Sequence, residues 1–169
     1  MEHAKVSRVR SYPPAGGLEA PPEATTLGRT SDLLAAWGSF IGDLAPWQWF
    51  VTLTFRPAHP CSVLPASKAS WLAWREFDRF CGWSRQPLHN VHWAAALEWQ
   101  RWRGVPHIHA LVGGLDSDRY SEVSAKAWEA FGFNRILSYD PELGASHYIA
   151  KYVTKELGDI RFSDNIRAR

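Results

Sequence analysis

Two histidines separated by one residue are the side chains of this sequence best suited to binding a metal ion. They stand in the run Gly104-Val105-Pro106-His107-Ile108-His109-Ala110-Leu111-Val112, which is apolar enough to form a strand. Side chains alternate between the two faces of a strand, so His107 and His109 point the same way. Taken alone, such a pair is also typical of polar residues on a half-exposed strand, and a second group of residues must decide between the two interpretations.

That second group lies near the end of the chain, in a predicted helix from Ser146 to Gly158. At 3.6 residues per turn, one side of this helix carries its tyrosines and lysines, which are Tyr148, Lys151, Tyr152 and Lys155. The other side is apolar and can dock on a sheet. The polar side can then face a site, although tyrosines that only pack and lysines that only face solvent would give the same pattern.

The elements that must position these residues follow from hydrophobic periodicity and turn residues. Helices are predicted over 30–46, 66–83, 116–132 and 140–158, and strands over 47–55, 91–99, 104–112 and 133–139. The strands at 91–99 and 104–112 form a hairpin. This order contains the β-α-β-β-α-β arrangement of a ferredoxin-like split βαβ fold. We therefore expect an α+β domain with a central antiparallel sheet of about five strands and flanking helices.

Composition divides the chain into three parts and limits its environment. Residues 1–29 predict a flexible, basic and Pro-rich leader, residues 30–160 the folded domain, and residues 161–169 a basic tail. Cys61 and Cys81 form no C-x-x-C pair, and neither a signal peptide nor an apolar run of about 18 residues is present. We expect a cytoplasmic protein without a membrane partner. The absence of a G-x-x-x-x-G-K-[ST] loop argues against ATP hydrolysis within this sequence.

Charge and aromatic content leave the partner open. The 19 Lys and Arg residues nearly balance 17 Asp and Glu residues, so a net charge of +2 does not by itself indicate a nucleic acid. Ten tryptophans are many for 169 residues. We expect Trp71, Trp74 and Trp128 in the core, whereas Trp99 and Trp102 are also candidates for stacking on bases.

The order of three motifs along the chain resembles that of the HUH endonucleases. The motifs are the strand Phe50-Val51-Thr52-Leu53-Thr54-Phe55, then His107-Ile108-His109, then Tyr148-x-x-Lys151-Tyr152 on a late helix. More narrowly, they are similar to those of rolling-circle replication initiators from phages and plasmids with two tyrosines. The resemblance covers about residues 47–158.

The resemblance implies a role for each motif. His107 and His109 would bind a divalent metal, Mg²⁺ or Mn²⁺, and Tyr148 would attack a DNA phosphate. Lys151 could stabilise the phenolate or position the phosphate, and Tyr152 occupies the position of a second tyrosine. A third ligand often comes from the preceding strand, where Glu98 stands nine positions before His107. Trp99 and Gln100 are weaker substitutes for that role.

The implied activity is a metal-dependent, sequence-specific nicking and joining of single-stranded DNA. The enzyme would cut an origin hairpin or nick site, form a 5′-phosphotyrosine adduct and so initiate rolling-circle replication, with a helicase supplied by the host. Candidate DNA contacts are Arg56, Arg101, Trp102, Arg103 and Lys155, because cations and aromatic rings hold phosphates and unstacked bases. Two alternatives stay open: a transposase with the same chemistry, and a non-catalytic module that binds single-stranded nucleic acid.

Overall fold

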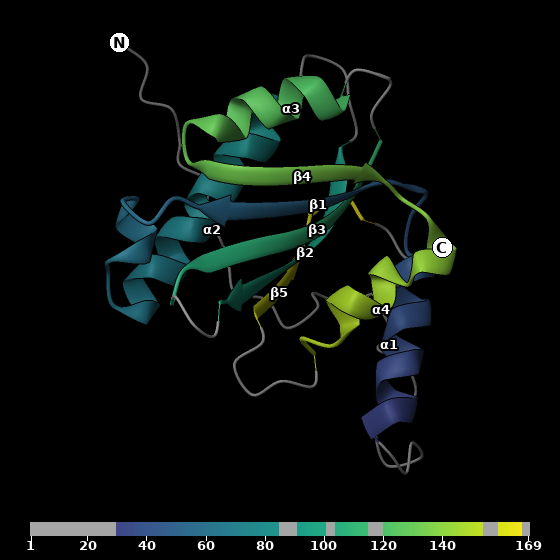
Figure 1. The fold of residues 1–169 in the computed structure, drawn as a ribbon. Helices are drawn as coiled ribbons and strands as arrows, with labels where there is room; N and C mark the ends of the chain where they lie inside the picture. Colours follow the sequence, from purple (N-terminus) through teal and green to yellow (C-terminus); the bar gives the residue numbers. More distant parts are fainter. Residues whose placement is uncertain (1–29, 85–90, 101–103, 115–119, 154–158, 167–169) are drawn as a thin grey trace.

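The computed structural model describes residues 30–84, 91–100, 104–114, 120–153 and 159–166. It contains a five-stranded sheet with the strand order β4-β1-β3-β2-β5 (Figure 1). The strands are β1 (Trp47–Phe55), β2 (His92–Trp99), β3 (Pro106–Gly113), β4 (Gly132–Ser138) and β5 (Asp159–Phe162). Each pair of neighbouring strands is antiparallel.

The connections give the expected ferredoxin-like fold. Helix α2 (Ala66–Ser84) joins β1 to β2, and β3 lies between these two strands in the sheet. Helix α3 (Tyr120–Glu129) joins β3 to β4 in the same way, with β1 between them. The predicted α+β class and split βαβ order are therefore confirmed.

In the described part of the chain, helices α1 to α4 lie in pairs on the two faces of the sheet (Figure 1). Helices α2 and α3 pack on one face, where the larger core includes Val51, Leu53, Ile108, Phe77 and Trp128. On the opposite face, helix α1 (Thr30–Asp43) and helix α4 (Ala145–Ala150) pack over Leu111 and neighbouring alanines of β2. Because side chains alternate along each strand, the residues between those of the larger core point to the α1/α4 face. Thr52, His107 and His109 are among them.

A glycine keeps the β1–β4 pairing close. Gly132 lies opposite Phe55 at the start of β4. A Cβ atom at this position would overlap the carbonyl oxygen of Thr54, so any other residue would displace the backbone of β1. This close approach fixes the register of β4 on β1 next to Thr54.

The last helix is shorter than predicted. Asp140 and Pro141 do begin a helical turn, but it is a 3-10 turn over Pro141–Leu143, which ends at Gly144 with φ +69°. Helix α4 then runs only from Ala145 to Ala150, and the amide of Tyr152 bonds back to the carbonyl of Ile149, three residues earlier. The prediction of a regular helix to Gly158 was therefore wrong after Ala150, because the last described turn tightens to the 3-10 spacing. Residues 154–158 of that predicted helix lie outside the described residues.

Two further expectations differ from the structure. No strand was predicted over residues 159–162, where the structure has β5. This strand pairs with β2 and crosses the expected boundary between the folded domain and the tail at residues 160 and 161. Trp74 and Trp128 are buried as expected, whereas Trp71 is 61% exposed on α2. In the part of the chain that the structure describes, no helix is long and apolar enough to cross a membrane. The predicted leader at residues 1–29 lies outside the described residues.

Candidate functional site

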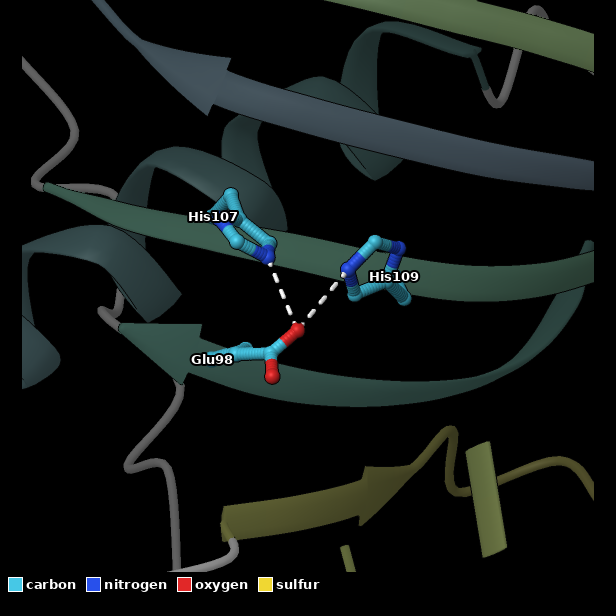
Figure 2. Close-up of side chains that lie close together, drawn as sticks. All are labelled: Glu98, His107 and His109. Atoms are coloured by element: carbon cyan, nitrogen blue, oxygen red, sulfur yellow. Dashed lines mark hydrogen bonds and ion pairs between the residues drawn. The ribbon is translucent and has the colours of Figure 1, made fainter. Parts of the chain in front are cut away.

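Pairing of β2 with β3 brings one carboxylate beside both histidines. Glu98 lies directly opposite His107 in the antiparallel register. Its Oε2 atom is 3.0 Å from Nε2 of His107 and 3.4 Å from Nε2 of His109. Figure 2 shows the three side chains converging, with the carboxylate from β2 and both imidazoles from β3. The predicted neighbourhood of Glu98, His107 and His109 is therefore present.

The donor atoms of this cluster fit a divalent metal ion. One ligand atom from each of the three residues lies within 4.8 Å of the others. Two imidazole nitrogens and one carboxylate oxygen would leave coordination positions for water and substrate oxygens, as catalytic rather than structural sites do. Burial, and then the neighbouring His107, lowers the pKa of His109 to about 3. The imidazole of His109 is thus neutral at neutral pH, which is the form that binds a metal.

A threonine on β1 orients one of the imidazoles. Thr52 lies opposite His109 in the β1–β3 register, and its Oγ1 atom is 3.1 Å from Nδ1 of His109. With the proton on Nδ1, this nitrogen donates to the hydroxyl and Nε2 keeps its lone pair toward Glu98. Alternation along a strand puts Thr52 and Thr54 on one face, but nothing in the sequence pairs Thr52 with His109. The β1–β3 register was the missing information.

Helix α4 brings Tyr148 to the same cluster. The Tyr148 hydroxyl is 3.3 Å from Oε2 of Glu98 and 3.3 Å from Nε2 of His109. Tyr148 is 36% exposed, so its side chain is open to solvent while its hydroxyl lies next to the candidate ligands. On the other side of α4, the His147 ring lies so close to Gly38 of α1 that a Cβ atom there would overlap it. This contact helps to fix the orientation of the helix.

Tyr152 meets the same carboxylate from a buried position. It is only 2% exposed, and its hydroxyl donates to Oε2 of Glu98. Burial, followed by the hydrogen bond to Glu98, raises the pKa of Tyr152 well above that of an ordinary tyrosine. The side chain therefore stays a neutral phenol that donates to Glu98, whereas Tyr148 occupies the exposed position.

Lys151 adds a positive charge between the tyrosines. Its Nζ atom lies 3.2 Å from the centroid of the Tyr148 ring, 4.8 Å from that of Tyr152 and 3.9 Å from Oε2 of Glu98. A cation over an aromatic face is attracted by the ring quadrupole. The ammonium group is thus held beside the Tyr148 ring and close to the cluster.

Of the candidate DNA contacts, only Arg56 lies among the described residues. The Arg56 guanidinium donates to the backbone carbonyl of Glu129 at the end of α3. Trp99, at the end of β2, is half-buried. The predicted contacts at Arg101, Trp102, Arg103 and Lys155 lie outside the described residues. DNA binding by these residues remains a prediction.

Comparison with known proteins agrees with this arrangement of motifs. The sequence model of the family described as Replication-associated protein ORF2 matches residues 48–157, which is more than half of the chain. The matched segment includes β1, the Glu98–His107–His109 cluster and both tyrosines. No curated protein and no solved structure matches the chain. The chain belongs to this family of replication-associated proteins of the ORF2 type, a family that fits the rolling-circle replication initiators of the HUH superfamily.

Proposed function

We propose that this protein is a metal-dependent endonuclease that nicks and rejoins a specific single-stranded DNA site to initiate rolling-circle replication. One observation carries the proposal. A single carboxylate oxygen, Oε2 of Glu98, lies within 3.4 Å of both histidines and of the Tyr148 hydroxyl. A candidate nucleophile and three candidate ligands therefore meet at one point, and the nucleophile is the member of the group that is exposed. Because the chain belongs to a family of replication-associated proteins, DNA is the substrate that we expect for such a site.

The covalent step transfers a phosphate from DNA to Tyr148. The phenolic oxygen forms a bond to phosphorus, and the bond from phosphorus to the 3′-oxygen breaks. The phenolic proton ends on the leaving oxygen, so the products are a 5′-phosphotyrosine and a free 3′-hydroxyl. Since the adduct is itself a phosphodiester, the reverse reaction rejoins the strand without ATP. Mg²⁺ or Mn²⁺ held by Glu98, His107 and His109 would supply positive charge to the phosphoryl oxygens.

The neighbouring residues of α4 have different roles in this proposal. Lys151 would contact the phosphate and offset the charge that gathers there, because its ammonium group is already beside the Tyr148 ring. Tyr152 would act as a positioning residue that holds the Glu98 carboxylate through its hydrogen bond. The burial of Tyr152 supports Tyr148 as the first nucleophile. A helicase from the host would open the duplex ahead of the 3′-end.

A search for the adduct tests this function. The protein would be incubated with labelled single strands of randomised sequence and Mn²⁺, denatured, and examined for DNA that migrates with the protein. We expect a denaturant-resistant species whose attached strands share one sequence at the 5′-end. No adduct with Mn²⁺ or Mg²⁺ would overturn the proposal, and DNA binding without it would support the non-catalytic alternative. A transposase would give an adduct with the ends of a mobile element instead of a replication origin.

The Thr52 hydroxyl provides a more selective test of the metal centre. We expect Thr52→Val, which keeps the shape of the side chain, to weaken Mn²⁺ affinity by about 10- to 100-fold, because His109 loses the partner that orients it. Thr54→Val is the matched control, since Thr54 lies on the same face of β1 two residues away. Calorimetric titration with Mn²⁺ measures both variants. Equal affinities in the two variants would contradict the role of Thr52.

A further inference from the structure

Three exposed side chains line one face of the edge strand β4. Phe133 is 65% exposed, Leu137 is 40% exposed, and Arg135 between them is also exposed. They alternate along the strand with Asn134 and Ile136, which point toward α3 and the larger core. The set Phe133, Arg135 and Leu137, called here the β4 face, is thus the side of the strand that α3 does not cover.

The register of the sheet places the β4 face beside the metal centre. Phe133 lies opposite Thr54 of β1, which lies opposite His107 of β3. In the next row along the strands, Arg135 lies opposite Thr52, which lies opposite His109. The β4 face and the histidines are therefore on the same side of the sheet, two strand spacings or about 10 Å apart.

The side of the sheet that holds the histidines is covered only in part. Helices α1 and α4 pack over residues of β1, β2 and β3, among them Phe50, Ala94 and Leu111, and among the described residues this core includes none from β4. Among the described residues, Phe133 belongs to neither hydrophobic core. Exposed aromatic rings are the platforms on which proteins that bind single strands stack bases. Thr54 and His107, which follow Phe133 in the same row of the sheet, are both half-buried.

The chemistry of the β4 face matches single-stranded DNA. An exposed phenylalanine offers a ring on which an unpaired base can stack, and an arginine beside it offers a charge for the adjoining phosphate. We propose that the β4 face binds the strand that flanks the scissile phosphate, with Phe133 stacked on one of its bases. This inference rests on the proposed function, and it assigns the substrate track to residues that neither the motifs nor the sequence analysis singled out.

Binding can be measured without cleavage. The probe is a fluorescein-labelled oligothymidine of about 16 nucleotides, titrated with the full chain in EDTA over a range of salt concentrations. We expect Phe133→Ala to weaken binding by about 5-fold or more, and Phe133→Trp to retain it, because base stacking requires only an aromatic face. Arg135→Gln should reduce the slope of log K against log salt by about 0.7, the value for one phosphate contact on a single strand.

Matched controls lie on the opposite side of the molecule. Trp71 is as exposed as Phe133, and Arg75 stacks on it with its guanidinium carbon 4.9 Å from the ring centroid. Both residues are on α2, which covers the other face of the sheet. Trp71→Ala and Arg75→Gln should therefore leave both the affinity and the salt slope within error of the unchanged protein. Thermal melting checks that all variants are folded.

The outcomes separate this inference from the proposed nicking activity. Weaker binding of the probe by Phe133→Ala and Arg135→Gln supports DNA binding by the β4 face. This holds even if the unchanged protein forms no adduct, in which case only the nicking proposal fails. If the unchanged protein forms an adduct but Phe133→Ala and Arg135→Gln bind the probe as it does, only the proposal that the β4 face binds DNA is overturned. DNA binding by the β4 face is also overturned if the unchanged protein does not bind the probe or if Trp71→Ala weakens binding equally. The same holds if Phe133→Ala changes only the oligomeric state.

Discussion

Replacing Tyr148 with phenylalanine is expected to reduce formation of the protein–DNA adduct by at least about a thousand-fold. The substitution removes only the oxygen that would bond to phosphorus. It leaves the ring, which packs edge to face with His109 at a centroid distance of 4.6 Å. Because the residue is 36% exposed, the loss of its hydroxyl should change stability little. The measurement is the yield of denaturant-resistant adduct with labelled single-stranded DNA and Mn²⁺.

Tyr152→Phe is the matched control, since it removes the same oxygen one helical turn away. The hydroxyl of Tyr152 is buried and donates to Glu98, so its loss should reduce the adduct by no more than about tenfold. It should instead lower the free energy of unfolding by about 1.5–3 kcal/mol, the usual contribution of a hydrogen bond to a charged group. If Tyr152→Phe lost the adduct fully and Tyr148→Phe kept it, Tyr152 and not Tyr148 would be the nucleophile. Equal partial losses would mean that either tyrosine can attack.

The Glu98–His107–His109 cluster was accessible from sequence because it depends on two simple regularities. The alternation of side chains along a strand placed His107 and His109 on one face. The short connection between two adjacent strands then limited which residue could lie opposite them, and Glu98 does lie opposite His107. Both regularities are local in the chain. The order of the motifs added the tyrosine helix, which the structure places against the same carboxylate.

What the sequence did not reveal depends on contacts between distant segments. Thr52 meets His109 across 57 positions, and Asp159 of β5 accepts a hydrogen bond from the indole of Trp74 across 85. Strand β5 has only four residues, Asp159-Ile160-Arg161-Phe162, which is too short for a reliable period-two pattern. The β4 face was likewise hidden, because its exposure follows from which side of β4 helix α3 covers.

The error at Trp71 has a geometric cause. The large aromatic residues of α2 recur every third position at Trp71, Trp74, Phe77 and Phe80, a spacing that falls short of the 3.6 residues of a helical turn. Over the nine residues from Trp71 to Phe80 the helix makes two and a half turns, so the two side chains point in opposite directions. Phe80 faces the sheet at 2% exposed, and Trp71 faces solvent. Trp74 lies between these directions and is buried in the larger core, where its ring packs against Trp93 and the Arg161 guanidinium carbon lies 4.4 Å from the ring centroid.

Mn²⁺ is expected to stabilise this protein, and Glu98→Gln is expected to remove the effect. An ion that binds only the folded chain raises the free energy of unfolding by about 2.7 kcal/mol when its concentration is 100 times the dissociation constant. Glutamine has almost the same shape as glutamate, and its carbonyl oxygen can still accept the Tyr152 hydrogen bond. It lacks the negative charge, however, so the variant should fold without metal but show no shift on adding Mn²⁺.

Denaturant unfolding with and without Mn²⁺ measures this difference, and Glu142→Gln serves as the control. Glu142 is an exposed carboxylate on the 3-10 turn before α4, so its replacement should leave the Mn²⁺ effect at full size. Glu98→Gln should also form less adduct than Glu142→Gln, because the Tyr148 hydroxyl and His107 contact the same carboxylate oxygen of Glu98. An equal Mn²⁺ shift in Glu98→Gln would mean that the ion binds elsewhere. A shift lost without any loss of adduct would mean that the metal serves folding and not the chemistry of Tyr148.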